Sequence, residues 1–211
     1  MLLLAFDTAT PAITVALHDG ERVLASVAGE GSMAHGEWLV PFIAKAVDEA
    51  GVTMADLTDI AVGVGPGPFT GLRVGVVTAL TLGSTLGLKT HGVCSLDIIA
   101  SQVDSEVGFL VATDARRKEV YWARYHADGR RVEGPAVLKP ADLALIHPST
   151  PAYGRGATQY AEILAVVDGP QDPDAAALAA AVIAGIVEEV PLEPLYLRRP
   201  DAVPQVQLKR A

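Results

Sequence analysis

The residues of this chain that could do chemistry begin with the run GPGPFTGLR at positions 65–73, which lies between two apolar segments. A glycine-rich turn between a strand and a helix often binds phosphate, because its backbone N–H groups can approach the anion closely. This run is neither a P-loop, since no Lys follows its last glycine, nor a G-x-G-x-x-G turn. Pro66 and Pro68 also remove two backbone N–H groups. The pattern therefore favours a rigid turn that leads into a helix.

The elements around this turn can be predicted from the spacing of apolar residues. The run 58–65 predicts a strand, and 70–87 predicts a helix with Thr70 as its N-cap. A helix over 37–50 is expected before them, and Ser95 is expected to cap a helix after them. The apolar side chains that define the helix over 37–50 include Leu39, Phe42, Ile43 and Ala46.

Two aspartates open matching halves of the chain. Asp7 and Asp114 each end an apolar strand pattern, and a hairpin pattern follows each, turning at Asp19-Gly20 and at Asp128-Gly129. This repeat predicts a duplicated α/β fold with segments 1–105 and 106–211. In each half, a mixed sheet opens with a strand and a β-hairpin and is flanked by helices. A single α/β domain with two ordinary hairpins is the alternative that the residues leave open.

The second half carries three further helix patterns. Two short ones cover 140–146 and 157–167. A longer, alanine-rich helix is expected with Asp172 as its N-cap and Pro173 at its first position. The proline-rich tail that follows is expected to be irregular.

The sequence lacks the residue patterns that are typical of metal sites and of catalytic nucleophiles. The five histidines include no His-x3-His pair, and no G-x-S-x-G run is present. Cys94 stands in the apolar run HGVCSLD and is expected to be a small buried side chain. We therefore predict no catalytic residue and no metal site, and a triad assembled from distant residues is the alternative left open.

Charge and composition restrict the partners and the compartment. The net charge is −9, with 16 basic and 25 acidic residues, which disfavours strong direct binding to nucleic acid but leaves room for a small basic patch. A single cysteine fits a reducing compartment. The N-terminal run MLLLAFDTAT predicts neither a signal peptide nor a membrane span. These features together predict a cytoplasmic protein without a membrane partner.

Small residues recur every fourth position in the helix expected over 70–87. The stripe consists of Gly71, Gly75, Ala79, Gly83 and Gly87. Each glycine inside a helix costs about 1 kcal/mol relative to alanine, so the stripe suggests close approach of another backbone. The rest of the helix is apolar nearly all round, which predicts burial on two sides. The second side faces either a partner protein or another part of this chain.

Seven segments of the sequence, taken together in this order, resemble the bacterial TsaB (YeaZ) family of the actin/hexokinase/heat-shock-ATPase superfamily. These segments run from one end of the chain to the other, and GPGPFTGLR is the most specific part. They are LLLAFDTATPAITVAL, HGEWLVPFIAKAV, AVGVGPGPFTGLRVGVVTALTLGSTLGL, VCSLDIIA, DARRKEVYWARY, YGRGA and PLYLRRPDA.

The resemblance implies a non-catalytic scaffold or activating subunit in the synthesis of N6-threonylcarbamoyladenosine at position 37 of ANN-decoding tRNAs. In that family a catalytic paralogue, TsaD, is the partner, and an ATPase, TsaE, can join the pair. A homodimer is implied when TsaD is absent, and tRNA is expected to be bound mainly through the partner. The implied interface comprises Leu39, Phe42, Ile43, Ala46, Gly71, Arg73, Gly75, Val76, Ala79, Leu80 and Gly83. For Arg73, pairing with a partner carboxylate and simple solvation are both open.

The superfamily holds nucleotide phosphates between two Asp-led hairpins. Here neither turn has the glycines that let a backbone approach a phosphate. We therefore expect no required cofactor, and at most weak ATP or ADP binding in a relic cleft formed by Asp7, Thr8, Asp114, Gly154 and Gly156. A small-molecule kinase or ATPase of the same superfamily is the main alternative, and a glycoprotease-like peptidase is the second.

Overall fold

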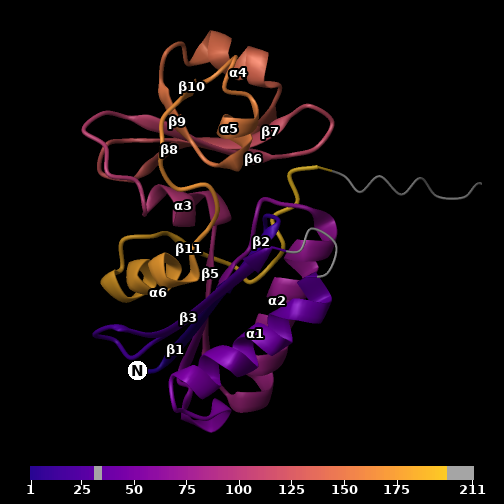
Figure 1. Ribbon diagram of the computed structural model, residues 1–211, viewed down its shortest axis with the longest axis vertical. Helices are drawn as coiled ribbons and strands as arrows, with labels where there is room; N and C mark the ends of the chain where they lie inside the picture. The colour runs from indigo at the N-terminus through magenta and orange to yellow at the C-terminus, as the bar shows by residue number, and fades with distance from the viewer. Residues whose placement is uncertain (31–34, 199–211) are drawn as a thin grey trace, which may run out of the picture.

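A computed structural model describes residues 1–30 and 35–198 of the chain (Figure 1). The first half contains β1 (Leu3–Asp7), β2 (Ala12–His18), β3 (Val23–Glu30), α1 (His35–Glu49), a short 3₁₀ turn (Met54–Asp56), β4 (Asp59–Gly63), α2 (Phe69–Leu86), β5 (Lys89–Val93) and α3 (Ser95–Ala100). The second half contains β6 (Phe109–Asp114), β7 (Val120–Tyr125), β8 (Arg131–Leu138), α4 (Pro140–Ile146), β9 (Pro151–Tyr153), α5 (Arg155–Gln159), β10 (Ala165–Val166), α6 (Ala175–Ala184) and β11 (Glu189–Val190).

The two halves share one topology, which confirms the predicted duplicated, actin-like α/β fold. The strand orders are β3-β2-β1-β4-β5 and β8-β7-β6-β9-β10, and β11 extends the first sheet beside β5. In both halves the first strand pairs antiparallel with the second and parallel with the fourth. The aspartate turns also match, because the amide of Ala9 donates to Asp7 Oδ1 at 2.6 Å and that of Arg116 donates to Asp114 Oδ1 at 2.9 Å.

Helices cover both faces of each sheet. Alternate side chains of β1 point to opposite faces, so that Leu4 and Phe6 join the core beneath α1 and α2, whereas Leu3 and Ala5 join the core beneath α6. On the second sheet, α3 packs against one face, and α4 and α5 lie with the apolar residues of the other face. Figure 1 shows α3 between the two sheets.

The helices α3 and α6 each pack against the sheet of the other half of the chain. The α3 helix follows the first sheet in the sequence, yet its Leu96 and Ile99 pack against the second sheet. The α6 helix follows the second sheet, yet it packs against the first, and β11 adds a strand there. The division into domains 1–105 and 106–211 stays a prediction. The segment 106–211 contributes elements to both sheets, since it contains α6 and β11.

The predicted N-caps of α2 and α6 are corrected by the structure. The N-cap of α2 is Pro68, whose carbonyl accepts from the amide of Leu72, and Thr70 lies inside the first turn. Asp174 caps α6 by accepting from Ala177, because Asp172 is held instead by an ion pair with Arg155.

The helix expected over 157–167 is mostly absent. The α5 helix ends at Gln159, and residues 165–166 form β10, which pairs parallel with β9. Backbone pairing at this sheet edge outweighs the helical preference of a short apolar run.

The helix α2 is long and apolar enough to cross a membrane by length and composition alone. Leu72, Val76 and Ala79 of this helix are nonetheless buried in the protein itself, and Val76 and Ala79 belong to the core of the first sheet. A core helix of a globular protein meets the same criterion, and the packing accounts for the apolar character of this side of α2.

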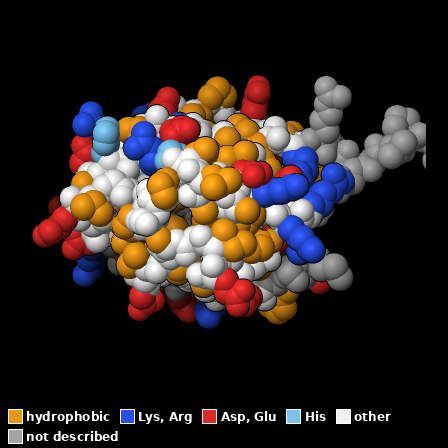
Figure 2. Space-filling model, turned by 90° about the horizontal axis from the view of Figure 1, so that it is seen from above, with side chains coloured by type: hydrophobic (Ala, Val, Ile, Leu, Met, Phe, Trp, Pro, Cys, Tyr) orange, Lys and Arg blue, Asp and Glu red, His pale blue; other side chains and the backbone are white. Residues whose placement is uncertain are grey.

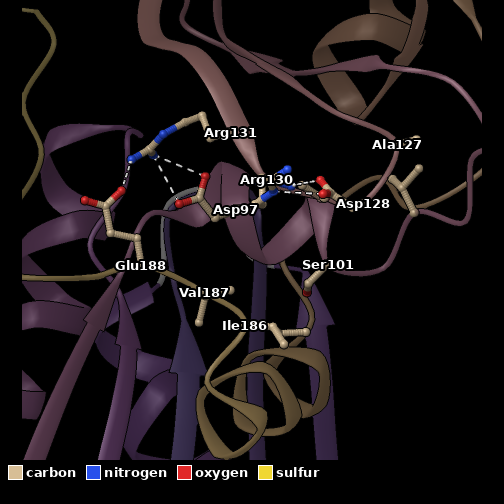
Figure 3. Close-up of a pocket in the computed structure, with 12 residues that line it drawn as sticks. Asp97, Ser101, Ala127, Asp128, Arg130, Arg131, Ile186, Val187 and Glu188 are labelled. Atoms are coloured by element: carbon tan, nitrogen blue, oxygen red, sulfur yellow. Dashed lines mark hydrogen bonds and ion pairs between the residues drawn. The ribbon is translucent and has the colours of Figure 1, made fainter.

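An ion-pair network links α3, β8 and the segment before β11, beside a cavity of about 390 Å³ (Figure 3). The buried Asp97 of α3 accepts from the Tyr125 hydroxyl at 2.8 Å and from Arg131 at 3.1 Å. Arg131 also pairs at 3.0 Å with Glu188, which precedes β11. Burial raises the pKa of the Asp97 carboxyl, and Arg131 and Tyr125 oppose that rise. Arg131 therefore compensates a charge buried between the two sheets.

Replacing Arg131 with Met should lower the free energy of unfolding by about 3 kcal/mol, because Asp97 would lose the cation that compensates its burial. Arg130 is the matched control: its side chain is 76% exposed, against 17% for Arg131. We expect Arg130→Met to change stability by no more than about 0.5 kcal/mol in urea denaturation. Equal losses in the two variants would show that the network does not hold the two sheets together.

Candidate functional site

Asp7 lies at the end of β1, in the cleft where weak nucleotide binding is expected, but its side chain is enclosed. The residue is 1% exposed, and its Oδ2 accepts from the Ser95 hydroxyl at 2.6 Å. Ser95 Oγ in turn accepts from the amide of Gly65 at 3.1 Å. Burial raises the pKa of the Asp7 carboxyl to about 6, although hydrogen bonds from Ser95 and Ala9 oppose the rise. The role expected for Ser95 as a helix cap is therefore wrong, since Cys94 holds that position.

The loop 65–68 and helix α2 cover the turn that follows Asp7. A Cβ built on Gly67 would lie 2.3 Å from the Ala9 carbonyl oxygen, and one built on Gly75 would lie 2.5 Å from Thr8 Oγ1. The Thr8 hydroxyl also donates to the Gly71 carbonyl at 2.8 Å. Any larger side chain at Gly67 or Gly75 would push the covering segment away. The GPGP run is therefore a lid on the first aspartate turn and not a phosphate cradle.

On the second half, Asp114 lies at the equivalent place and its side chain is about one-quarter exposed. The two glycines of the expected cleft serve backbone packing instead. A Cβ on Gly154 would lie 2.4 Å from the Ala112 carbonyl oxygen, and one on Gly156 would lie 2.6 Å from the Thr113 backbone carbon. Gly154 also has a φ of +98°, which favours glycine.

The space between the two aspartate turns is small. It measures about 20 Å³, and its lining includes Thr10, Asp114, Arg116 and Arg155. Arg155 is held at 2.6 Å by both Asp172 and Glu30 and thereby joins α5 to β3. Of the expected cleft residues, only Asp114 lines this space in the described part of the chain. Nucleotide binding stays a prediction.

The stripe of small residues in α2 faces the sheet of its own chain, and the implied partner interface stays a prediction. Gly71, Gly75, Val76, Ala79 and Gly83 are buried. Gly83 approaches Thr90 of β5, and Gly75 approaches Thr8. Glycine is needed here because the helix lies directly on the strands and turns of the first sheet. In α1, Leu39, Ile43 and Ala46 are likewise buried, and Phe42 is partly buried.

The sides of α1 and α2 that point away from the core carry exposed apolar side chains, which together we call the α1–α2 face. Its exposed side chains are Trp38, Val40, Phe69, Val77 and Leu80. Val40 also lines a groove of about 480 Å³, which is formed mainly by aliphatic residues of both helices together with Val52 and Met54. Leu80 and Arg73 are the predicted interface residues that lie exposed here. Trp38 and Val77 were missed because the prediction followed the small residues instead of their opposite side.

The chain's own C-terminal segment covers one end of α2. Tyr196 stacks on Phe69 with ring centroids 5.0 Å apart, and its hydroxyl accepts from Arg73 Nε at 3.1 Å. The Arg73 guanidinium also lies 4.1 Å from the centre of the Phe69 ring. Neither alternative left open for Arg73, a partner carboxylate or simple solvation, included this contact.

Nucleophile and metal chemistry find little support in the described residues. Cys94 is buried, and burial raises the pKa of its thiol to about 12, so it holds its proton at neutral pH. Among residues 1–30 and 35–198, no group of three or more His, Cys, Asp or Glu side chains is arranged to hold a metal ion. The prediction of no catalytic residue remains untested.

Comparison with known proteins places these features in a family. The model of the family described as TsaD, tRNA N6-adenosine threonylcarbamoyltransferase, matches residues 27–207. An uncharacterized protein of Mycobacterium bovis is 47% identical over 210 residues, covering 96% of this chain and 94% of the relative. The Escherichia coli tRNA threonylcarbamoyladenosine biosynthesis protein TsaB is 36% identical over 147 residues, covering 66% of this chain and 63% of that protein. The solved structure of YeaZ from Pseudomonas aeruginosa superposes with a TM-score of 0.75 at 31% identity, covering 93% and 99% of the two chains.

The enclosed Asp7 predicts a particular dependence of stability on pH. The folded chain keeps the Asp7 proton up to a pKa of about 6, whereas the unfolded chain loses it near 3.8. Stability therefore falls by about 3 kcal/mol as the pH rises through this window. Asp7→Asn has no proton to lose, so its stability relative to the wild type should improve by about that amount from pH 4 to pH 7 in urea denaturation.

Asp128→Asn provides a control of opposite sign. Asp128 is exposed, and hydrogen bonds from Arg130 hold the pKa of its carboxyl below the usual range. That carboxylate contributes stability which is present at neutral pH and lost as the pH falls. The free energy of unfolding of the Asp128→Asn variant, relative to that of the wild type, should therefore decrease as the pH rises. If the free energies of unfolding of the wild type and the Asp7→Asn variant changed equally with pH, this would contradict the burial of the Asp7 carboxyl.

Proposed function

The chain belongs to the TsaB (YeaZ) family, and from this premise we propose that it is the non-catalytic, partner-binding subunit in the synthesis of N6-threonylcarbamoyladenosine in tRNA. In this proposal it pairs with a TsaD-like paralogue that performs the transfer at position 37 of ANN-decoding tRNAs, and a TsaE-like ATPase joins the pair. It acts in the cytoplasm, and it forms a homodimer when the paralogue is absent.

The single observation that carries the proposal is the exposed apolar α1–α2 face. Val77 is 55% exposed and Leu80 is 47% exposed in the middle of a helix whose other side is a tightly packed core. An apolar surface beside an apolar groove is what a partner helix or sheet would cover, because covering it removes apolar area from water. Membership of the family supports a TsaD-like paralogue as that partner in this proposal.

The closed cleft supports a subunit without its own phosphoryl chemistry. A kinase of this fold needs space for a nucleotide between the aspartate turns, and the space here is about 20 Å³. The covering of Asp7 by loop 65–68 would have to move before this carboxylate could face a metal-bound phosphate. No observation favours the peptidase alternative, since both Cys94 and Ser95 are buried.

Leu80→Asp and Val77→Asp should each weaken pairing with the TsaD-like paralogue by at least about 30-fold, because a charge would then lie inside an apolar contact. Both side chains point away from the core, so the variants should lose less than about 1 kcal/mol of folding stability. Size-exclusion chromatography with light scattering detects the complex, and calorimetric titration gives its affinity.

Leu145→Asp is the matched control for these variants. Leu145 is an apolar helical residue that is 79% exposed, and it belongs to α4 on the second sheet. Its replacement should leave pairing unchanged. Retained pairing in both α2 variants, with folding intact, would place the interface elsewhere.

A further inference from the structure

The turn between β6 and β7 has a costly conformation and a concentrated charge. Arg116, Arg117 and Lys118 are consecutive, exposed and basic, with φ angles of 62°, 53° and 60°. Left-handed backbone costs roughly 1–2 kcal/mol for each residue other than glycine. Adjacent like charges add repulsion. Such a turn lowers the stability of the folded chain, and backbone strain of this kind points to a function.

Neighbouring groups hold the turn in place and add a further cation. The Arg116 amide donates to Asp114 Oδ1, and its guanidinium lies 3.7 Å from the same carboxylate. Arg198 of the C-terminal segment donates to the Ala115 carbonyl at 2.8 Å and forms an ion pair with Glu119. Arg198 thus adds a further cation beside the three basic residues of the turn. Figure 2 shows Lys and Arg side chains gathered at one end of the molecule.

The duplicated half shows that this fold does not require an exposed basic turn. The residues equivalent to Arg116, Arg117 and Lys118 are Ala9, Thr10 and Pro11, of which Ala9 and Thr10 are buried and Pro11 is half-buried. The two turns start from the same aspartate hydrogen bond. The first therefore became part of the core, whereas the second presents positive charge to solvent on a chain whose net charge is −9.

We propose that the turn 116–118, together with Arg198, contacts the phosphate backbone of tRNA held by the complex; this rests on the proposed function. The turn lies beside the end of the α1–α2 face, because Pro68 lines the same small space as Arg116, and Tyr196 stacks on the first residue of α2. Arginine and lysine on an exposed turn match phosphate oxygens without reading sequence. The surplus of acidic residues elsewhere confines the contact to this turn.

The test measures tRNA binding by the complex of this chain with its TsaD-like paralogue. The probe is an unmodified, fluorescently labelled transcript of an ANN-decoding tRNA, followed by anisotropy over a series of salt concentrations. The variant carries Arg116→Gln, Arg117→Gln and Lys118→Gln. The matched control carries Arg22→Gln, Lys89→Gln and Arg130→Gln, which are exposed cations away from this turn. Both variants change the net charge by the same amount.

We expect the turn variant to bind tRNA at least about tenfold more weakly and to lower the salt slope by two to three, while the control stays within about twofold of the wild type. An affinity and slope equal to the control would overturn the proposal. Loss of the protein complex itself in the turn variant would also overturn it and make the turn a protein contact. Failure of the wild-type proteins to pair in light scattering would reject the proposed function, and this proposal with it.

Discussion

The close approach of α2 and its leading loop to the turn after Asp7 is the constraint on which the rest of the structure depends. Gly67 and Gly75 have no side chain where one would strike Ala9 and Thr8. The loop can therefore lie on the turn, and Asp7 is enclosed with Ser95. The same contact fixes the rotation of α2, so that its small residues face the sheet and Val77 and Leu80 face solvent. This one packing relation encloses the Asp7 turn and leaves the apolar side of α2 exposed.

The two halves share one topology but place their aspartate turns in different environments. Each retains a strand, an aspartate and a hairpin, and each aspartate accepts a hydrogen bond from the amide two residues later. In the first half, burial turns the aspartate into an internal support for loop 65–68. In the second, Asp114 supports an exposed basic turn. The packing of α3 and α6 against the sheet of the other half ties the halves together, and the Asp97–Arg131 pair strengthens that junction.

Much of the fold follows from the sequence, because it rests on local patterns. The Asp19-Gly20 and Asp128-Gly129 hairpins and the two long helices of the first half obey turn chemistry and apolar spacing. The site was harder to predict because its key contacts are long-range. The pattern of small residues indicated a close approach, but only the structure shows that Thr8 and Thr90 are the neighbours. The contact of Tyr196 with Arg73 joins residues 123 positions apart, and no local pattern announces it.

The central claim is that this chain works through the α1–α2 face and not through the carboxylate of Asp7. The most direct test is mass spectrometry of tRNA nucleosides from a host in which the chromosomal gene is replaced by the Asp7→Asn or the Leu80→Asp variant. The account predicts normal N6-threonylcarbamoyladenosine with Asp7→Asn and a strong loss with Leu80→Asp, at equal protein levels. Loss with Asp7→Asn and normal levels with Leu80→Asp would contradict it, because the carboxylate would then be essential and the face dispensable.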